Sequence, residues 1–121
     1  MASGKLDLVR AVFAAYLAND RKAVEDCFTD DFRFTSPYDD GIDKANYFAR
    51  CWQSPDWIER HELEKILVEG SDAFVTYRCQ ARDGKSFRNT EFFRFDGDKI
   101  KRIDVYFGAS YRDGVFVKQP Q

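Results

Sequence analysis

The spacing of apolar residues changes along the chain, and the first third carries helical spacing. In KLDLVRAVFAAYLAND (residues 5–20) the large apolar side chains fall on one stripe: Leu6, Val9, Phe13, Tyr16 and Leu17. This spacing predicts an amphipathic helix. The segment RKAVEDCF (residues 21–28) predicts a second, short helix that Asn19 or Asp20 can cap. Helical spacing returns in DKANYFARCW (residues 43–52), which predicts a third helix with Asp43 as its cap.

Alternation of apolar and polar residues replaces this spacing elsewhere. FRFTSP (residues 32–37) predicts a short strand that Pro37 ends, and YDDG (residues 38–41) predicts a turn or loop rich in acids. From Arg60 on, four strand-like runs follow, at residues 60–69, 73–82, 87–95 and 99–107. The runs are separated by pairs that are typical of hairpin turns: Gly70-Ser71, Asp83-Gly84 and Asp96-Gly97.

Together these elements predict an α+β fold. Each run is about ten residues long, and long antiparallel strands in a small domain usually curl. Three N-terminal helices are therefore expected to pack in the concavity of one curved, mostly antiparallel sheet. The 121 residues contain no repeat, low-complexity tract or linker, so residues 1–121 are expected to form a single domain.

Composition adds one unusual feature, the aromatic content. Aromatic residues make up 17% of the chain, with 12 Phe, 6 Tyr and 2 Trp, which indicates either a very bulky core or an aromatic-lined cavity. The net charge of −2, with scattered basic residues, argues against nucleic-acid binding. No apolar run approaches the length of a membrane span, and the first residues lack the charged-then-apolar pattern of a signal peptide, so neither a membrane span nor a signal peptide is expected.

The cysteines and the single histidine argue against a metal site. Cys27, Cys51 and Cys79 form no CxxC pair, and their spacing to a histidine is not that of a metal site. We therefore expect reduced thiols in a cytoplasmic protein, with no metal and no cofactor. Cys51 and Cys79 are expected to be small buried residues, since no histidine partner for a thiol nucleophile is evident.

The order of the elements, together with FTDDFRFTSP, DKANYF and EFFRFDGDKIKRIDVYFG, resembles the nuclear transport factor 2-like superfamily, and most of all its SnoaL-like branch. The resemblance covers nearly the whole chain. It implies a cone-shaped half barrel with a pocket between sheet and helices, commonly in a dimer. Members include ketosteroid isomerase, scytalone dehydratase, limonene epoxide hydrolase and polyketide cyclases, and others only bind or only dimerise, so the fold selects no activity.

Glu91 is the main candidate site residue. Alternation places Glu91 on the same face of its strand as Asn89, Phe93 and Phe95. By resemblance to ketosteroid isomerase, Glu91 falls at the position of the oxyanion-hole acid. Among aromatic rings a carboxylate loses hydration, so its pKa rises and the protonated form can donate a hydrogen bond to a carbonyl or an enolate. The alternative is a Glu91 that faces solvent in a salt bridge with a neighbouring arginine, which would leave no site.

The other two functional groups of that isomerase have no direct counterpart. The resemblance places Ser36 where the isomerase has its general base, and Val12 where it has a tyrosine, although Tyr16 lies one helical turn away. Steroid-type isomerisation is therefore not expected. Asp39 and Asp40, just past the proline, are the alternative candidates for a base.

The last strand offers two faces. One face is expected to be the concave, packed set: Ile103, Val105 and Phe107. Asp104 and Tyr106 then face outward, and Asp104 stays a candidate because an acid on this strand is catalytic in some hydrolases and cyclases of the superfamily. Outward aromatic residues such as Phe92 and Tyr106 would form an exposed patch on a monomer, so a homodimer through the sheet face is expected.

Aromatic side chains from several elements are expected to line the pocket: Tyr16, Phe34, Trp52, Tyr77, Phe93 and Phe107. Trp57 is a further candidate, although large aromatic residues are usually core. His61 can serve as a general base at neutral pH, but it lies in ERHELEK among charged residues, so a surface position is expected.

Three hypotheses for function follow from these residues. The first is an enzyme that acts without cofactor on a small hydrophobic carbonyl or epoxide compound, by isomerisation, dehydration, cyclisation or epoxide hydration, with Glu91 as the acid. The second is a pocket that binds a hydrophobic small molecule without turnover. The third is an interaction module whose sheet face dimerises. The missing base slightly favours the second hypothesis.

Overall fold

The computed structural model describes residues 3–52 and 57–118. Its helices are α1 (Ser3–Leu17), α2 (Arg21–Cys27) and α3 (Lys44–Arg50). Aspartates cap both short helices: Asp20 accepts a hydrogen bond from the backbone N–H of Ala23 at 3.2 Å, and Asp43 accepts one from that of Asn46 at 2.9 Å. The three predicted helices are confirmed, with α2 ending at Cys27 because Phe28 has extended backbone.

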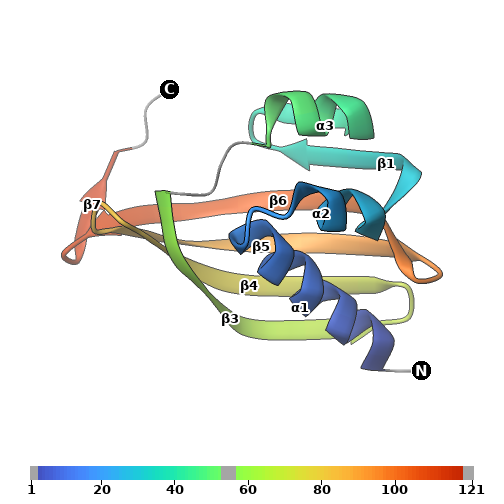
Figure 1. Cartoon of the computed structure of the whole chain (residues 1–121). Coiled ribbons are helices and arrows are strands. Elements are labelled where there is room, and N and C mark those ends of the chain that lie inside the picture. Colours follow the sequence, from blue (N-terminus) through green and yellow to red (C-terminus); the bar gives the residue numbers. More distant parts are fainter. Residues whose placement is uncertain (1–2, 53–56, 119–121) are drawn as a thin grey trace.

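The strands form one curved sheet that does not close into a barrel. They are β1 (Phe28–Ser36), β2 (Asp39–Asp43), β3 (Ile58–Glu69), β4 (Asp72–Ala81), β5 (Lys85–Asp96), β6 (Lys99–Arg112) and β7 (Val115–Val117). Their order is β2-β1-β6-β5-β4-β3, with β7 paired to β6, and only the β1–β6 pair is parallel among the described strands. Figure 1 shows the long strands β3 to β6 side by side, with α1 and α2 against one face and α3 beside β1. The predicted α+β half barrel is confirmed.

Only the start of the predicted turn or loop at residues 38–41 is correct: Tyr38 lies in a turn, whereas residues 39–41 belong to a strand. Asp39–Asp43 forms β2, which pairs antiparallel with β1. The backbone N–H of Gly41 donates to the Thr35 hydroxyl at 2.9 Å, and Gly41 has a positive φ of 63°, which suits glycine. The hairpin at Asp113-Gly114, which joins β6 to β7, is a further element that was not predicted. Both residues of that turn have positive φ, the geometry that an Asp-Gly pair favours, although no strand is predicted there.

Alternation along the strands builds the core. On β4 every second side chain is buried: Ala73, Val75, Tyr77, Cys79 and Ala81. Phe93 and Phe95 of β5 share that face and pack with Val9 and Phe13 of α1 in one hydrophobic cluster. Burying a side chain of this size contributes about 1.5–3 kcal/mol to stability. Glu91 has the same parity as Phe93, so the concave face also carries a carboxyl.

Candidate functional site

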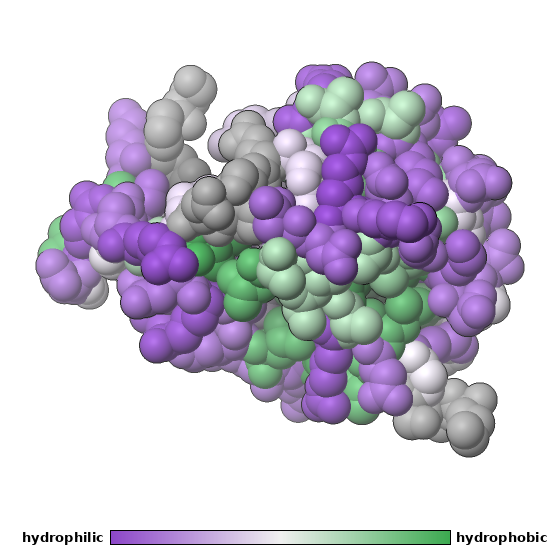
Figure 2. Space-filling model, in the orientation of Figure 1, coloured by the Kyte–Doolittle hydropathy of each residue, from purple (hydrophilic) through white to green (hydrophobic). Residues whose placement is uncertain are grey.

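A cavity of about 630 Å³ lies between the concave face of the sheet and the helices. Its lining comes from every helix and from β1 and β3 to β6, and most of it is aromatic or aliphatic. Figure 2 shows the side of the molecule on which α1 and α2 cover the sheet, and hydrophobic side chains gather in the middle of this side, among hydrophilic ones. The charged lining residues other than Glu91 lie at the turn between β4 and β5: Arg82, Asp83 and Lys85. The volume of the cavity lies in the range of about 300–1,000 Å³ that is usual for ligand pockets in general.

Aromatic rings border the open side of this cavity. Tyr38 and Phe107 pack edge to face with their centroids 5.5 Å apart, and Tyr38 is 65% exposed. Trp57 stacks on Phe87 at 6.2 Å and is 45% exposed. All four side chains line the cavity, so much of its exposed lining consists of aromatic rings.

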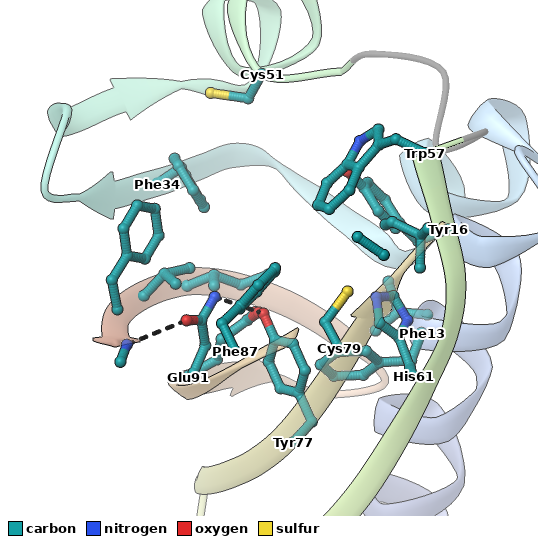
Figure 3. A pocket seen from close by; sticks show the side chains of 18 of the residues that line it. Phe13, Tyr16, Phe34, Cys51, Trp57, His61, Tyr77, Cys79, Phe87 and Glu91 are labelled. Carbon is teal, nitrogen blue, oxygen red and sulfur yellow. Dashed lines mark hydrogen bonds between the residues drawn. The ribbon is translucent and has the colours of Figure 1, made fainter. Parts of the chain in front are cut away.

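A directed chain of hydrogen bonds ends at Glu91 (Figure 3). The backbone N–H of Gly108 donates to Asn89 Oδ1 at 3.2 Å, and the Asn89 amide donates from Nδ2 to the Tyr77 hydroxyl at 3.1 Å. The Tyr77 hydroxyl then donates to Glu91 Oε2 at 2.5 Å. Every donor in this chain points towards Glu91. The other carboxyl oxygen, Oε1, has no hydrogen-bond partner among the described residues.

Burial and hydrogen bonding act on Glu91 in opposite directions. The apolar surroundings disfavour the charged carboxylate and raise the pKa of Glu91 from 4.5 to about 7, while the hydrogen bond from Tyr77 lowers it in part. Burial and the neighbouring Glu91 together raise the pKa of Tyr77 well above 10, so its hydroxyl stays protonated. At neutral pH Glu91 therefore exists in both protonation states, which is the condition for a group that donates or accepts a proton.

Gly108 starts this chain from a place where β6 has no room for a side chain. A Cβ atom at Gly108 would lie 2.0 Å from the carbonyl oxygen of Arg88 on β5. The pairing of β5 with β6 is irregular here, between Phe87 and Asn89. The close approach of the two strands brings the backbone N–H of Gly108 within hydrogen-bond distance of Asn89 Oδ1. The Asn89 side chain is buried, so its polar atoms need hydrogen-bond partners within the protein.

His61 lines the cavity, which corrects the expected surface position. Its ring centroid lies 5.6 Å from those of Phe13 and Tyr77 and 6.1 Å from that of Tyr16. Burial lowers the pKa of His61 from 6.5 to about 4, so the imidazole is neutral at pH 7. The charged neighbours in ERHELEK hid this position, because Arg60 and Glu62 point the other way and bind one another at 2.8 Å. The available signal was the spacing to Leu63: residues two apart on a strand share a face, so an inward Leu63 predicts an inward His61.

Five of the six aromatic residues expected in the pocket line the cavity: Tyr16, Phe34, Tyr77, Phe93 and Phe107. Trp52 is not among the lining residues. Its ring lies beside Tyr16, with centroids 5.2 Å apart, and beside Phe48 at 5.8 Å. The tryptophan on the wall is Trp57, which directly precedes β3. Trp52 follows α3, whose inner side packs onto β1, and its ring joins that layer.

The other candidate acids do not meet Glu91 in the cavity. Asp39 binds Arg50 at 2.8 Å and lies 3.6 Å from the Cys51 sulfur, and Asp40 is exposed. Asp104 is buried on the outer face under Arg102, at 2.8 Å. None of these three carboxylates is a lining residue.

Apart from Glu91 and the charged residues at the turn between β4 and β5, the lining side chains carry no charge at pH 7. Ile103, Val105 and Phe107 face the cavity, as their parity predicts. The three cysteines are free, and burial raises the pKa of the Cys51 and Cys79 thiols to about 11, so neither is a thiolate at pH 7.

Residues 3–52 and 57–118 contain no cluster of side chains that could hold a metal ion. Within the same ranges no helix has the length and apolarity to cross a membrane.

Comparison with known proteins places this architecture in a family. Residues 9–103, most of the chain, match the family model of the SnoaL-like domain. This chain belongs to the SnoaL-like family. No curated protein matches the SnoaL-like chain.

Solved structures similar to this SnoaL-like domain share its fold at low identity. An NTF2-like protein of unknown function from Burkholderia xenovorans LB400 has a TM-score of 0.77 and 20% identity, over 98% of this chain and 89% of that one. A candidate ketosteroid isomerase from Kribbella flavida DSM 17836 has a TM-score of 0.75 and 16% identity, over 95% and 89%. A candidate hydroxylase from Streptomyces galilaeus has a TM-score of 0.74 and 17% identity, over 89% and 90%. These likenesses establish the α+β cone fold alone.

Proposed function

We propose that this SnoaL-like protein binds a small, neutral, largely apolar molecule in the cavity, and that protonated Glu91 donates a hydrogen bond to an oxygen of that molecule. One observation carries the proposal: Glu91 lies on an apolar wall with Oε2 bonded by Tyr77 and Oε1 without a partner among the described residues. Oε1 is not one of the buried atoms, so it is open to the cavity that Glu91 lines. A hydrogen bond to a bound molecule there contributes about 0.5–1.5 kcal/mol to binding.

The direction of the hydrogen bonds decides where the proton of Glu91 lies. Oε2 already accepts the Tyr77 hydroxyl, so a protonated Glu91 carries its own proton on Oε1. A carboxyl in that state is a donor towards a carbonyl-type oxygen. A charged ligand group would lose its hydration on the apolar wall, which favours a neutral molecule.

Ligand binding as a function of pH tests this proposal. With the aromatic ketone 2-acetylnaphthalene as the probe, we expect binding about tenfold tighter at pH 6 than at pH 8.5, because the donor is lost as Glu91 ionises. Glu91→Gln keeps the size of the side chain and removes this pH dependence. Glu64→Gln, on the outer face, is the matched control and leaves the dependence unchanged. Equal affinity at both pH values in the natural protein contradicts the proposed role of Glu91.

Proton transfer on the bound molecule is the second candidate function. The pKa of about 7 favours it, since a group that titrates near the working pH both takes up and releases protons efficiently. An ionised Glu91 would remove a proton from the carbon next to the carbonyl and return it, with no change in charge over the cycle. Exchange of deuterium from heavy water into the methyl group of 2-acetylnaphthalene, followed by NMR, measures this step. Catalysed exchange that survives Glu91→Gln excludes Glu91 as its agent.

We also propose that the outer sheet face forms a homodimer. Leu67 and Phe74 lie opposite one another on this face, 57% and 49% exposed, and the Phe74 ring packs on Phe92 at 5.1 Å. Exposed apolar side chains that adjoin in this way are typical of interfaces. Sedimentation of the natural protein should give twice the mass of 14.1 kDa, and Phe74→Glu should give the monomer. Tyr38→Glu, at the cavity mouth, is the control that leaves the dimer intact.

A further inference from the structure

His61 presents a second unpartnered polar atom to the cavity. Its Nδ1 is buried and lacks a hydrogen-bond partner among the described residues. Its Nε2 has no partner among them either, and this atom is not one of the buried ones, so it is open to the cavity that His61 lines. A neutral imidazole carries one N–H and one lone pair, and neither is matched by protein here.

The rings around His61 favour one tautomer. Phe13 and Tyr77 both contact the imidazole edge to face, at interplanar angles of 90° and 71°. An N–H beside aromatic rings is better tolerated than a lone pair, because the π-electrons repel the lone pair. Nδ1 is the imidazole nitrogen that is buried in these surroundings, so we assign the proton to Nδ1, which leaves the lone pair on Nε2. With a pKa of about 4, His61 accepts hydrogen bonds at neutral pH without becoming protonated.

Tyr77 separates this acceptor from the donor at Glu91. One end of the Tyr77 side chain, its hydroxyl, binds Glu91, and its ring lies 5.6 Å from the ring of His61. Figure 3 shows His61 and Glu91 on the two sides of Tyr77. The wall between them is apolar and contains Cys79, whose thiol is protonated at neutral pH. The cavity thus has two polar positions of opposite character, with apolar surface between them.

We infer that His61 is the second polar anchor of this site, and that the molecule bound there carries two functions: a carbonyl-type oxygen that accepts from Glu91 and a hydroxyl that donates to His61. This inference rests on the proposed function and narrows its ligand to a hydroxylated, apolar carbonyl compound. A low pKa makes His61 a poor general base at pH 7, so its role is to bind and orient the ligand.

A cycle of ligand and protein changes tests the inference. The probes are 2-acetylnaphthalene and its hydroxyl-substituted isomers, measured at pH 6 by titration calorimetry. At least one isomer should bind the natural protein about fivefold to tenfold more tightly than the parent ketone. His61→Phe should remove that gain, so that the hydroxylated isomer binds this variant no more tightly than the parent ketone does, whereas His61→Gln, which keeps an acceptor, should restore part of it.

The possible results separate this inference from the proposed function. Binding of the parent ketone without a gain for any hydroxylated isomer overturns the role of His61 alone. A gain that persists in His61→Phe does the same. Absence of binding by every probe overturns both the role of His61 and the proposed function.

The natural protein supplies an independent reading should His61→Phe not fold. Because the chain has one histidine, its ring nitrogens give unique ¹⁵N signals. The Nε2 signal should shift when a hydroxylated isomer binds and stay in place when the parent ketone binds. An unchanged Nε2 signal with every hydroxylated isomer overturns the inference.

Discussion

The two faces of the sheet treat the same side chain in opposite ways. Glu64 of β3 lies on the outer face with Arg88, 2.7 Å away, and the hydrogen bond from that guanidinium lowers the pKa of Glu64. Glu91 of β5 lies on the inner face, where burial raises its pKa to about 7. Arg88 and Glu91 belong to one strand, so alternation alone assigns them to the two environments. The difference teaches that the parity of a residue determines whether burial raises the pKa of its carboxyl or an ion pair lowers it.

The largest contrast between the faces is expected for adjacent phenylalanines. Phe93 is 1% exposed in the core, so Phe93→Ala should lower the free energy of unfolding by about 3–5 kcal/mol, through lost burial and the space left behind. Phe92, half-buried on the outer face, is the matched control, and Phe92→Ala should lower it by about 1 kcal/mol. Urea unfolding measures both. Equal losses would mean that the two faces are packed alike.

The pH dependence of stability sharpens the contrast between the glutamates. The pKa of Glu91 is higher in the folded protein than in the unfolded chain, so the unfolded chain ionises first and stability falls as pH rises from about 4.5 to 7. The loss amounts to about 3 kcal/mol, and Glu91→Gln should abolish it. The lowered pKa of Glu64 has the opposite sign: its contribution is present above pH 4.5 and is lost as pH falls through the folded pKa.

Urea unfolding of the natural protein, Glu91→Gln and Glu64→Gln across pH 3 to 8 tests these signs. As pH rises, the free energy of unfolding of the natural protein should fall relative to that of Glu91→Gln. Relative to that of Glu64→Gln it should instead rise. Parallel pH curves for the natural protein and Glu91→Gln would show that Glu91 lies in water.

Gly108 tests whether backbone geometry supports the inner face. In Gly108→Ala the new methyl group meets the carbonyl of Arg88, and the strands must move apart, which should lower the free energy of unfolding by about 1–3 kcal/mol. Gly4→Ala, in α1 with open space around it, should instead raise it by about 0.5–1 kcal/mol, because alanine favours a helix. Thermal unfolding distinguishes the two signs, and a neutral Gly108→Ala would contradict the close approach.

The smallest effect is expected for the ion pair on the outer face. Arg88→Ala removes the partner of Glu64, but the arginine side chain is 60% exposed, and water and salt already screen the pair. The change in unfolding free energy should be close to experimental error and should vanish in high salt. A loss as large as that of Phe93→Ala would show that the proposed dimer interface extends from Phe74 over this ion pair and excludes water from it.

Much of the fold could be predicted because hydrophobic spacing reports it directly. The stripe of α1 and the alternation of β3 to β6 are strong patterns, and the Asp-Gly pairs gave the hairpins. Segment 39–43 could not be recognised as β2, because its acids are poor strand formers and its pairing with β1 supplies the stability. Asp113-Gly114 is also a typical hairpin pair, but β7, which follows it, has only three residues, too few for alternation to predict a strand.

Site residues could be predicted only where apolar residues in the same strand show which side chains face the concave side of the sheet. Glu91 could be placed because Phe93 and Phe95 mark its face, whereas the charged residues around His61 concealed an inward position. The choice between Trp52 and Trp57 depended on how α3 packs, which spacing does not encode. The chain of bonds from Gly108 to Asn89 and Tyr77 joins three strands in register, and a single sequence carries no signal for such a register.

The hydrogen-bond chain behind Glu91 has one more consequence, for the fate of a proton. A backbone amide and an Asn side chain neither take up nor release protons at neutral pH, so the path from Glu91 through Tyr77 is a dead end. Any proton that passes between Glu91 and bulk water must then travel through the cavity that Glu91 lines. A molecule seated there would seal that route. For as long as it stays, the proton it shares with Glu91 is held in a closed compartment and can move only between the two of them.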